Sequence, residues 1–281
     1  MNASFKSPLF AHAAAIVLVV GSATCGGCAK FKASNDRNWS LDQAMLPSAE
    51  FSKDHKQVTV HNVRACEYRS ADDYTVKHYD KTYDLTKLTT VDFVRVPFPE
   101  LPELAHTMLS FGFDDKDYVG VSVEIRKEQG EKYNPALAAL NKYEIMYVVG
   151  DERDLIGLRT NFRLNDVYIY PTRATPEQTR QLFEHVLARV NKLKDKPEFY
   201  NTLTNNCTTN IARHINELVP GKIPPLDYRV LMPGYSDRLA YDLGLLNTPY
   251  SFEETRAAAR VTDLAYQHRD DPNFSQAIRR R

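Results

Sequence analysis

AHTMLSFGFDDKDYVGVSVEIR, residues 105–126, contains two alternating segments separated by a short polar turn. Residues 105–113 and residues 118–126 each alternate between apolar and other side chains, and the polar run 114–117 joins them. A period of two is typical of β-strands, and a short polar connection favours an antiparallel pairing. This stretch therefore predicts a β-hairpin.

The two faces of the predicted hairpin differ in chemistry, because consecutive strand residues point to opposite faces. One face is apolar and carries Leu109, Phe111, Phe113, Val119, Val121, Val123 and Ile125. The other face carries His106, Ser110, Gly112, Gly120, Ser122, Glu124 and Arg126. If the turn is centred on Asp115, His106 and Glu124 lie near each other, whereas a register slip of one residue would separate them.

Further elements on both sides of the hairpin predict an α+β fold. Strand patterns occur over residues 58–63, 76–83, 91–96, 144–149 and 167–170. Thr175 and Gln178 form a capping box around Pro176 and open a helix that extends to about residue 193. A second helix is expected from Cys207 to just before Pro220, with shorter helices over 235–245 and 252–266. We expect an antiparallel sheet packed against the helix that begins at Cys207.

The chain divides into three predicted regions. Residues 1–29 combine Lys6, an apolar run over 9–20 and small residues at 21–23, which is the pattern of an export signal. The run is shorter than the ~20 residues of a spanning helix, so cleavage is expected, with lipid modification of Cys25 or Cys28 as the alternative. Residues 30–250 form the main domain, which begins with a polar, irregular arm over 30–56. Residues 251–281 form a helical tail with a polar, frayed end.

The composition excludes two classes of protein. Among 281 residues, Lys and Arg number 36 and so do Asp and Glu, which lacks the basic excess of a nucleic-acid binder. Sixteen Tyr and thirteen Phe argue against a disordered chain. No spaced Cys and His set completes a metal site, so we expect neither a metal nor an organic cofactor.

Cys207 is the candidate nucleophile. It shares one helical face with Ile211, Ile215 and Leu218, and it lies in the first turn of the predicted helix. Unpaired backbone N–H groups and the helix dipole favour an anion there, which promotes the thiolate and could hold an oxyanion. Asn206 is a candidate cap or oxyanion donor. The alternatives for Cys207 are a small buried apolar residue and a disulfide with Cys66.

A thiolate nucleophile also needs a base. His214 lies two helical turns from Cys207, about 10 Å away, and is too distant to take its proton. His55, His61, His78 and His185 are expected at the surface or in packing positions. His106 is the candidate base because Ser122 and Glu124 share its face of the hairpin.

Four blocks of sequence support this choice through a resemblance. They are HTMLSFGF at 106–113, SVEIRKEQGE at 122–131, YVVGDERD at 147–154 and NCTTN at 206–210, in that order. Together they resemble the Lnb N-terminal periplasmic domain family, over roughly residues 38–245. That family is named for an envelope enzyme that moves an acyl chain on bacterial lipoproteins.

The resemblance implies roles and a fold. Cys207 matches the nucleophile and His106 the base, and their order resembles circularly permuted relatives of papain such as NlpC-type peptidases and lecithin-retinol acyltransferases. It thus implies a permuted papain-like fold. Strand geometry, not the resemblance, offers Glu124 or Arg126 as the third polar residue. Candidate oxyanion or substrate-binding residues are Asn206, Thr208, Ser122 and Arg126.

Three functions follow as expectations for an exported, periplasm-facing protein. The first is a thiol acyltransferase on lipoprotein or phospholipid acyl groups, and the second is a cysteine hydrolase of the envelope. The third is a non-catalytic binding module. An apolar groove leading to Cys207 would favour the first, a narrow polar cleft the second, and burial of Cys207 away from His106 the third. We expect a monomer whose partner is a membrane lipid or a lipoprotein, not a nucleic acid.

Overall fold

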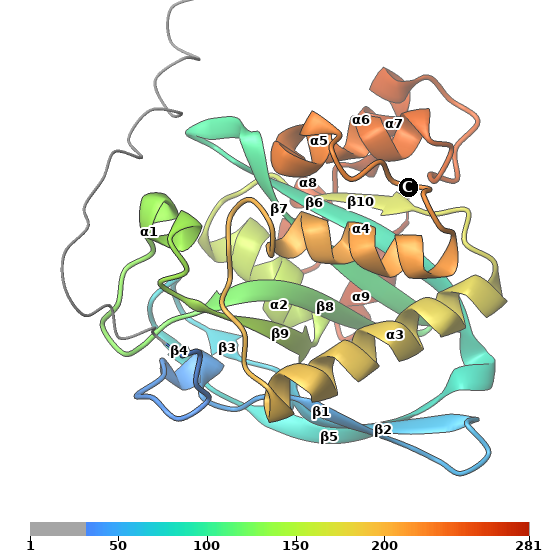
Figure 1. Cartoon of the computed structure of the whole chain (residues 1–281). Coiled ribbons are helices and arrows are strands. Elements are labelled where there is room, and N and C mark those ends of the chain that lie inside the picture. Colours follow the sequence, from blue (N-terminus) through green and yellow to red (C-terminus); the bar gives the residue numbers. More distant parts are fainter. Residues whose placement is uncertain (1–31, 281) are drawn as a thin grey trace, which may run out of the picture. The chain divides into compact units, whose positions relative to one another are not determined.

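An eight-stranded sheet organises the part of the chain that the structure describes (Figure 1). The structure is a computed structural model that describes residues 32–280, and residues 33–281 cluster as one unit. The strands run in the order β1-β2-β9-β8-β7-β6-β10, with β5 paired to β2. Their bounds are β1 (Ser48–Phe51), β2 (Gln57–Arg64), β5 (His78–Asp84), β6 (Leu88–Phe98), β7 (Leu101–Phe113), β8 (Asp117–Arg126), β9 (Glu144–Gly150) and β10 (Tyr168–Pro171).

The sheet is mixed and not purely antiparallel, which corrects one expectation. Arg64 of β2 pairs in parallel with Gly150 of β9, while the other strand pairs are antiparallel. A parallel neighbour needs a long crossover, and the chain from β2 to β9 supplies one that includes the central hairpin. The small strands β3 (Glu67–Tyr68) and β4 (Tyr74–Thr75) form a separate pair.

The predicted hairpin is confirmed as β7 and β8. Phe113 pairs with Asp117 and Met108 with Ser122, so the turn is centred on Asp115. The alternation of faces also holds, since Leu109 and Phe111 belong to one buried cluster and Met108 to another. Strand β7 begins at Leu101, several residues before the predicted start, because this segment pairs with β6.

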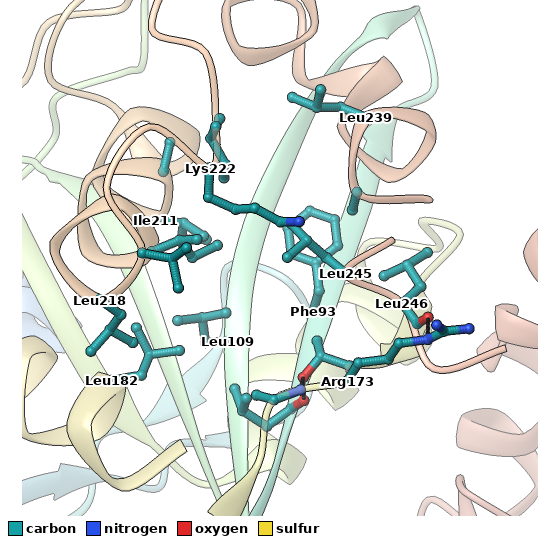
Figure 2. Close-up of a pocket in the computed structure, with 18 of the residues that line it drawn as sticks. Phe93, Leu109, Arg173, Leu182, Ile211, Leu218, Lys222, Leu239, Leu245 and Leu246 are labelled. Carbon is teal, nitrogen blue, oxygen red and sulfur yellow. Dashed lines mark hydrogen bonds between the residues drawn. The ribbon is translucent and has the colours of Figure 1, made fainter. Parts of the chain in front are cut away.

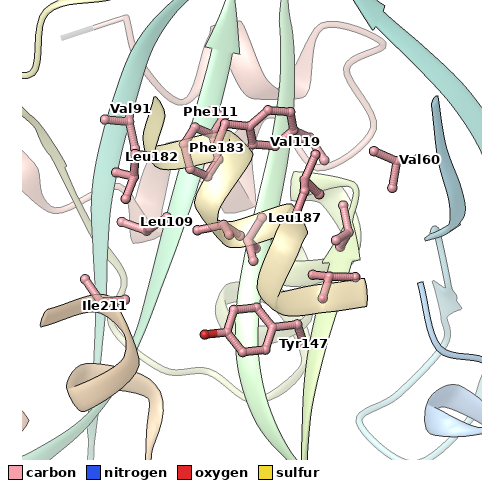
Figure 3. Packing of buried hydrophobic residues seen from close by; sticks show 14 of the residues in the cluster. Val60, Val91, Leu109, Phe111, Val119, Tyr147, Leu182, Phe183, Leu187 and Ile211 are labelled. Atoms are coloured by element: carbon pink, nitrogen blue, oxygen red, sulfur yellow. The ribbon is translucent and has the colours of Figure 1, made fainter. Parts of the chain in front are cut away.

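Two helices cover the face of the sheet that bears Leu109 and Phe111 (Figure 1). Helix α3 (Pro176–Asp195) begins with the predicted capping box, and helix α4 (Cys207–Leu218) begins at the predicted cysteine. Figure 3 shows Phe183 and Leu187 of α3 packed against the strands. Phe183 and Phe111 are both fully buried, with ring centroids 4.7 Å apart.

The opposite face is covered by α2 (Glu152–Gly157), the π-helical turn η3 (Leu158–Phe162), α8 (Thr262–Gln267) and α9 (Phe274–Ala277). The expectation of a frayed end after residue 266 is wrong. Phe274 and Ile278 are buried in the second core, and the Arg279 guanidinium bonds the carboxylates of Asp92 and Glu152. Burial of the apolar side chains and pairing of the buried carboxylates hold this segment in place.

The segment before β2 is also part of the fold, which corrects the expected irregular arm. Trp39 is buried, the turn η1 (Leu41–Gln43) follows it, and β1 pairs with β2. The export-signal residues, with Cys25 and Cys28, lie outside the described residues. Within residues 32–280, none of the helices combines the length and apolar character needed to cross a bilayer.

The remaining short elements connect these layers. They are the turn η2 (Leu85–Lys87), α1 (Pro135–Ala139), α5 (Tyr228–Leu231), η4 (Pro233–Tyr235), α6 (Ser236–Asp242) and α7 (Phe252–Ala259). Helices α6, α7 and α8 fall within the two regions predicted to be helical after residue 234.

Candidate active site

A chain of hydrogen bonds links His106 to Glu124. His106 Nε2 lies 2.7 Å from Ser122 Oγ, and Ser122 Oγ donates to Glu124 Oε1 at 2.7 Å. The register of the hairpin produces this group, because the three side chains occupy one face of adjacent strands. Glu124 also accepts a hydrogen bond from Arg159 Nη2 at 3.0 Å. The predicted closeness of His106 and Glu124 is confirmed, with Ser122 as the bridge.

The bridge fixes the tautomer of His106. A serine hydroxyl has a single proton, and that of Ser122 is donated to the Glu124 carboxylate. The Ser122 oxygen must therefore accept a hydrogen bond from a protonated His106 Nε2, which leaves Nδ1 of the neutral ring unprotonated. Nδ1 is then the atom able to accept a proton from a nucleophile.

Burial and charge keep His106 neutral and Glu124 ionised. Burial, assisted by the nearby Arg159 guanidinium, lowers the pKa of His106 to about 3. Burial alone would raise the pKa of Glu124, but the cations Arg64 and Arg159 outweigh it and hold that pKa well below its usual range. At neutral pH the site thus contains a neutral imidazole beside a charged carboxylate.

His106 and Glu124 line a polar cavity of about 360 Å³. The β7–β8 pairing ends at Met108 and Ser122, whereas β8 stays paired to β9 as far as Arg126. Val123, Glu124 and Ile125 all line this cavity although they point to alternating faces of β8. The cavity therefore lies beside the end of β8, beyond the last pair of β8 with β7.

Cys207 is the first residue of α4, as predicted. Asn206 caps the helix, since its side chain accepts from the backbone N–H of Thr209 at 2.8 Å. The predicted capping role of Asn206 is confirmed, and its amide also donates to the backbone carbonyl of Thr202. Cys207 is only 4% exposed. It is a free thiol, as is Cys66, so the alternative of a disulfide between them is wrong.

A pair of threonines connects the helix tip to β7. Cys207 Sγ lies 3.8 Å from Thr208 Oγ1, and Thr208 Oγ1 lies 3.0 Å from Thr107 Oγ1. Thr107 precedes Met108 and follows His106 on β7, so the thiol and the imidazole flank one strand. Because neighbouring strand residues face opposite ways, Thr107 faces α4 whereas His106 faces Ser122 and Glu124.

Cys207 and His106 thus lie on opposite sides of β7, and no hydrogen bond between them is found among the described residues. Two tyrosines also line the polar cavity. Tyr133 and Tyr200 line that cavity, and burial, with the nearby Cys207 as the next cause, raises the pKa of both phenols. Cys207 itself is not among the residues that line this cavity.

An apolar cavity of about 340 Å³ lies beside the same helix tip (Figure 2). Thr208, Ile211 and Leu218 line it from α4, and Phe93 and Leu109 line it from the sheet. Figure 2 also shows the Lys222 side chain extending over this apolar surface. Cavities of this volume are ordinary sites for small molecules.

The remaining predicted residues have structural contacts. Arg126 is buried, and its guanidinium donates to the carbonyls of Gln43 and Ala44 and to Asn35 Oδ1. It also lies over the ring of Trp39, and it is absent from the lining of the polar cavity. His214 is buried against Tyr147, with His214 Nε2 2.9 Å from the phenol oxygen.

Four residues of the site were not predicted. Arg64 and Arg159 supply the positive charge around Glu124, and Tyr133 and Tyr200 line the polar cavity. Arg159 lies within the π-helical turn, and both tyrosines lie in connecting segments. None of them belongs to a periodic pattern, so only the folded chain brings them together.

The fold and these side chains define an α+β protein with a cysteine at a helix tip and a hydrogen-bonded histidine on the adjoining strand. Residues 74–234 match the family described as the Lnb N-terminal periplasmic domain. The chain belongs to this family, which confirms the resemblance and indicates an exported protein of the cell envelope. No curated protein matches the chain. No solved structure matches it either.

Proposed function

We propose that this protein is an envelope enzyme that transfers acyl groups through a thioester on Cys207, with His106 as the base. The observation that supports the proposal is the position of Cys207 at the start of α4, directly before Thr208, which lines the apolar cavity. His106 lines a second, polar cavity, and Cys207 is not among the residues that line either one. An acyl chain in the first cavity would present its carbonyl group beside the thiol.

The reaction proceeds in two balanced steps. His106 Nδ1 takes the thiol proton, and Sγ attacks the carbonyl carbon of an ester. The ester C–O bond breaks, the leaving alcohol takes the proton from His106, and the acyl group stays on sulfur. An amine or water then attacks the thioester, the C–S bond breaks, and the nucleophile's proton returns to Cys207 through His106.

This mechanism requires the imidazole and the thiol to meet within hydrogen-bonding distance. β7 lies between the thiol and the imidazole, so the proposal includes a movement that brings the two groups together. Backbone N–H groups in the first turn of α4 are suited to hold the oxyanion. The His-before-Cys order is also the order of permuted papain-like enzymes, and the proposal includes that relationship.

Two other functions share part of this support. A hydrolase would use water as the acceptor, and the polar character of the His106 cavity favours it. A non-catalytic binding module is favoured by the burial of Cys207 and by its contact with Thr208 in place of His106.

The test is intact-protein mass spectrometry after incubation with bacterial membranes. We expect an acyl adduct on the native protein that is lost in Cys207→Ala and in His106→Ala. Cys66→Ala is the matched control, because Cys66 is also a buried free thiol, and burial raises its pKa to about 12. An adduct that persists in Cys207→Ala, or no adduct on any protein, would favour the binding module. Release as free acid or as an amide separates hydrolase from transferase.

A further inference from the structure

The wall of the polar cavity is rich in cations. Arg64, Arg159, Arg163 and Lys127 line it, together with the carboxylates of Asp42 and Glu124. Asp154 lies behind this wall and bonds Arg64. Four cations therefore face three carboxylates, and their pairing decides which charges remain available to a ligand.

Two of the guanidiniums already form ion pairs with carboxylates of the protein. Arg64 donates to both oxygens of Asp154 at 2.9 Å, and Arg159 donates to Glu124 at 3.0 Å. Both arginines are at least nine-tenths buried, with 3% and 5% of their surface exposed. These pairs form a rigid wall, because breaking a buried pair leaves an uncompensated charge.

The side chains of the other two cations have no partner in the described part of the protein. Among residues 32–280, the side chains of Lys127 and Arg163 make neither an ion pair nor a hydrogen bond to protein. Tyr133, Tyr200 and Asn165 also line the cavity, and their side chains make no hydrogen bond to protein in the described part of the chain. The cavity thus presents unused donors from the end of β8, from the chain after η3 and from the segments before α1 and α4.

We propose that this cavity binds a phosphate group. The residues with unused donors come from separate segments of the chain around the cavity, which suits a tetrahedral anion whose oxygens accept hydrogen bonds in different directions. A planar carboxylate is matched by a single fork of donors such as one guanidinium. Lys127 and Arg163 supply the charge, and the tyrosines and Asn165 supply neutral donors.

This inference rests on the proposed function where it names the substrate. A substrate with an acyl chain in the apolar cavity and a phosphate group in the polar cavity would be a phosphate-bearing lipid. The phosphate group can equally belong to a small soluble ester, so the experiment has separate arms for the two sources.

The test uses the Cys207→Ala protein, in which no thioester forms, so that binding is measured without turnover. Isothermal titration at constant ionic strength is carried out with sn-glycerol 3-phosphate, with acetate, and with dihexanoyl phosphatidylglycerol below its micelle concentration. We expect saturable binding of a phosphate-bearing probe and weaker binding of acetate. Lys127→Gln and Arg163→Gln should each lower the affinity for the phosphate probe about ten-fold or more, because each removes a charge-assisted hydrogen bond.

Lys53→Gln is the matched control, since Lys53 is an exposed lysine in the turn between β1 and β2. Binding of both phosphate probes supports the site, binding of the lipid alone or of glycerol phosphate alone also identifies its source, and no binding of either probe overturns the proposal. Acetate that binds as tightly as glycerol phosphate, or binding unchanged in both Gln variants, overturns the proposal. If phosphate binds but Cys207 forms no adduct with membranes, the phosphate site stands and the acyl-transfer proposal fails.

Discussion

Ser122 controls the chemistry of His106 although it carries no charge. It is fully buried, and its single hydroxyl connects the imidazole to Glu124. Only the acceptor role of its oxygen keeps the His106 proton on Nε2 and leaves Nδ1 free. Ser122 is thus a positioning residue whose effect on the imidazole can be measured without any substrate.

We expect that in Ser122→Ala the neutral His106 ring is no longer held in a single tautomer. Nitrogen-15 NMR of the histidine rings should show the Nε2–H tautomer in the native protein and a mixture of tautomers in the variant. His214 is the internal control, because its contact is with Tyr147 and does not involve Ser122. If the His106 nitrogen shifts are the same in both proteins, Ser122 does not set the tautomer.

The same residues show how far the sequence predicts the site. Strand alternation was sufficient to place His106, Ser122 and Glu124 on one face, because the period of a strand and the centre of the turn fix the register. It could not reveal that Thr107, and not His106, faces the thiol. That relation depends on which face of the sheet α4 covers, and no local pattern encodes it.

At the scale of elements, α4 depends on its N-terminal cap. Asn206 accepts from Thr209 N–H, and Thr209 Oγ1 accepts from Asn206 N–H at 2.8 Å, which completes a capping box. The cap orients the first turn, where Cys207 contacts Thr208 and Thr208 contacts Thr107. The position of the thiol therefore depends on this helix start.

Replacing Asn206 with Ala should lower the free energy of unfolding by about 1 to 2 kcal/mol, since it removes a buried N-cap. Asn206→Asp keeps the capping oxygen and should lower the free energy of unfolding by less, although it removes the amide donor to Thr202. Urea unfolding followed by circular dichroism measures both variants. Equal losses for Ala and Asp would mean that the contact with Thr202, and not the cap, stabilises the helix start.

Most elements were predictable because each has a local signal. The capping box of α3, the apolar stripe of α4 and the alternation of β7 and β8 all appear in the sequence. Strand β1 and helix α9 were not expected, because polar residues dominate these segments. Their placement comes from a few long-range contacts, such as buried Trp39 and Phe274.

At the scale of the whole molecule, Arg279 joins distant parts of the chain. Its guanidinium bonds Asp92 of β6, Glu152 of α2 and Ser110 of β7, and it lies 3.8 Å from the ring centroid of Tyr118. The Glu152 side chain is completely buried. Burial would raise the pKa of Glu152, but Arg279 outweighs it and holds the pKa below its ordinary value.

We expect Arg279→Met to destabilise the protein by about 3 to 5 kcal/mol at pH 7, because it leaves the buried Glu152 carboxylate without its cation. In the native protein the depressed pKa of Glu152 gives stability that is present above its unfolded pKa and is lost as pH falls through the folded value. In the variant this carboxyl loses its cation and protonates more readily. The destabilisation should therefore shrink as the pH is lowered from 7 towards 5.

Urea unfolding at several pH values measures this loss, with Arg280→Met as the control. Arg280 is exposed and its side chain has no ion pair among the described residues, so its replacement should change stability by less than about 0.5 kcal/mol. A loss that is equally large in both variants, or that does not depend on pH, would contradict the assigned role of Arg279.

Asp92 and Arg279 are separated by 187 positions along the chain. During synthesis, Asp92 of β6 cannot form this ion pair until residue 279 has been made, and long-range contacts of this kind form slowly. A polypeptide that lacks the contacts of Arg279 should be less compact and less stable in its native fold. For a protein of the cell envelope, delayed completion of the fold would help the new chain remain unfolded until it has been exported.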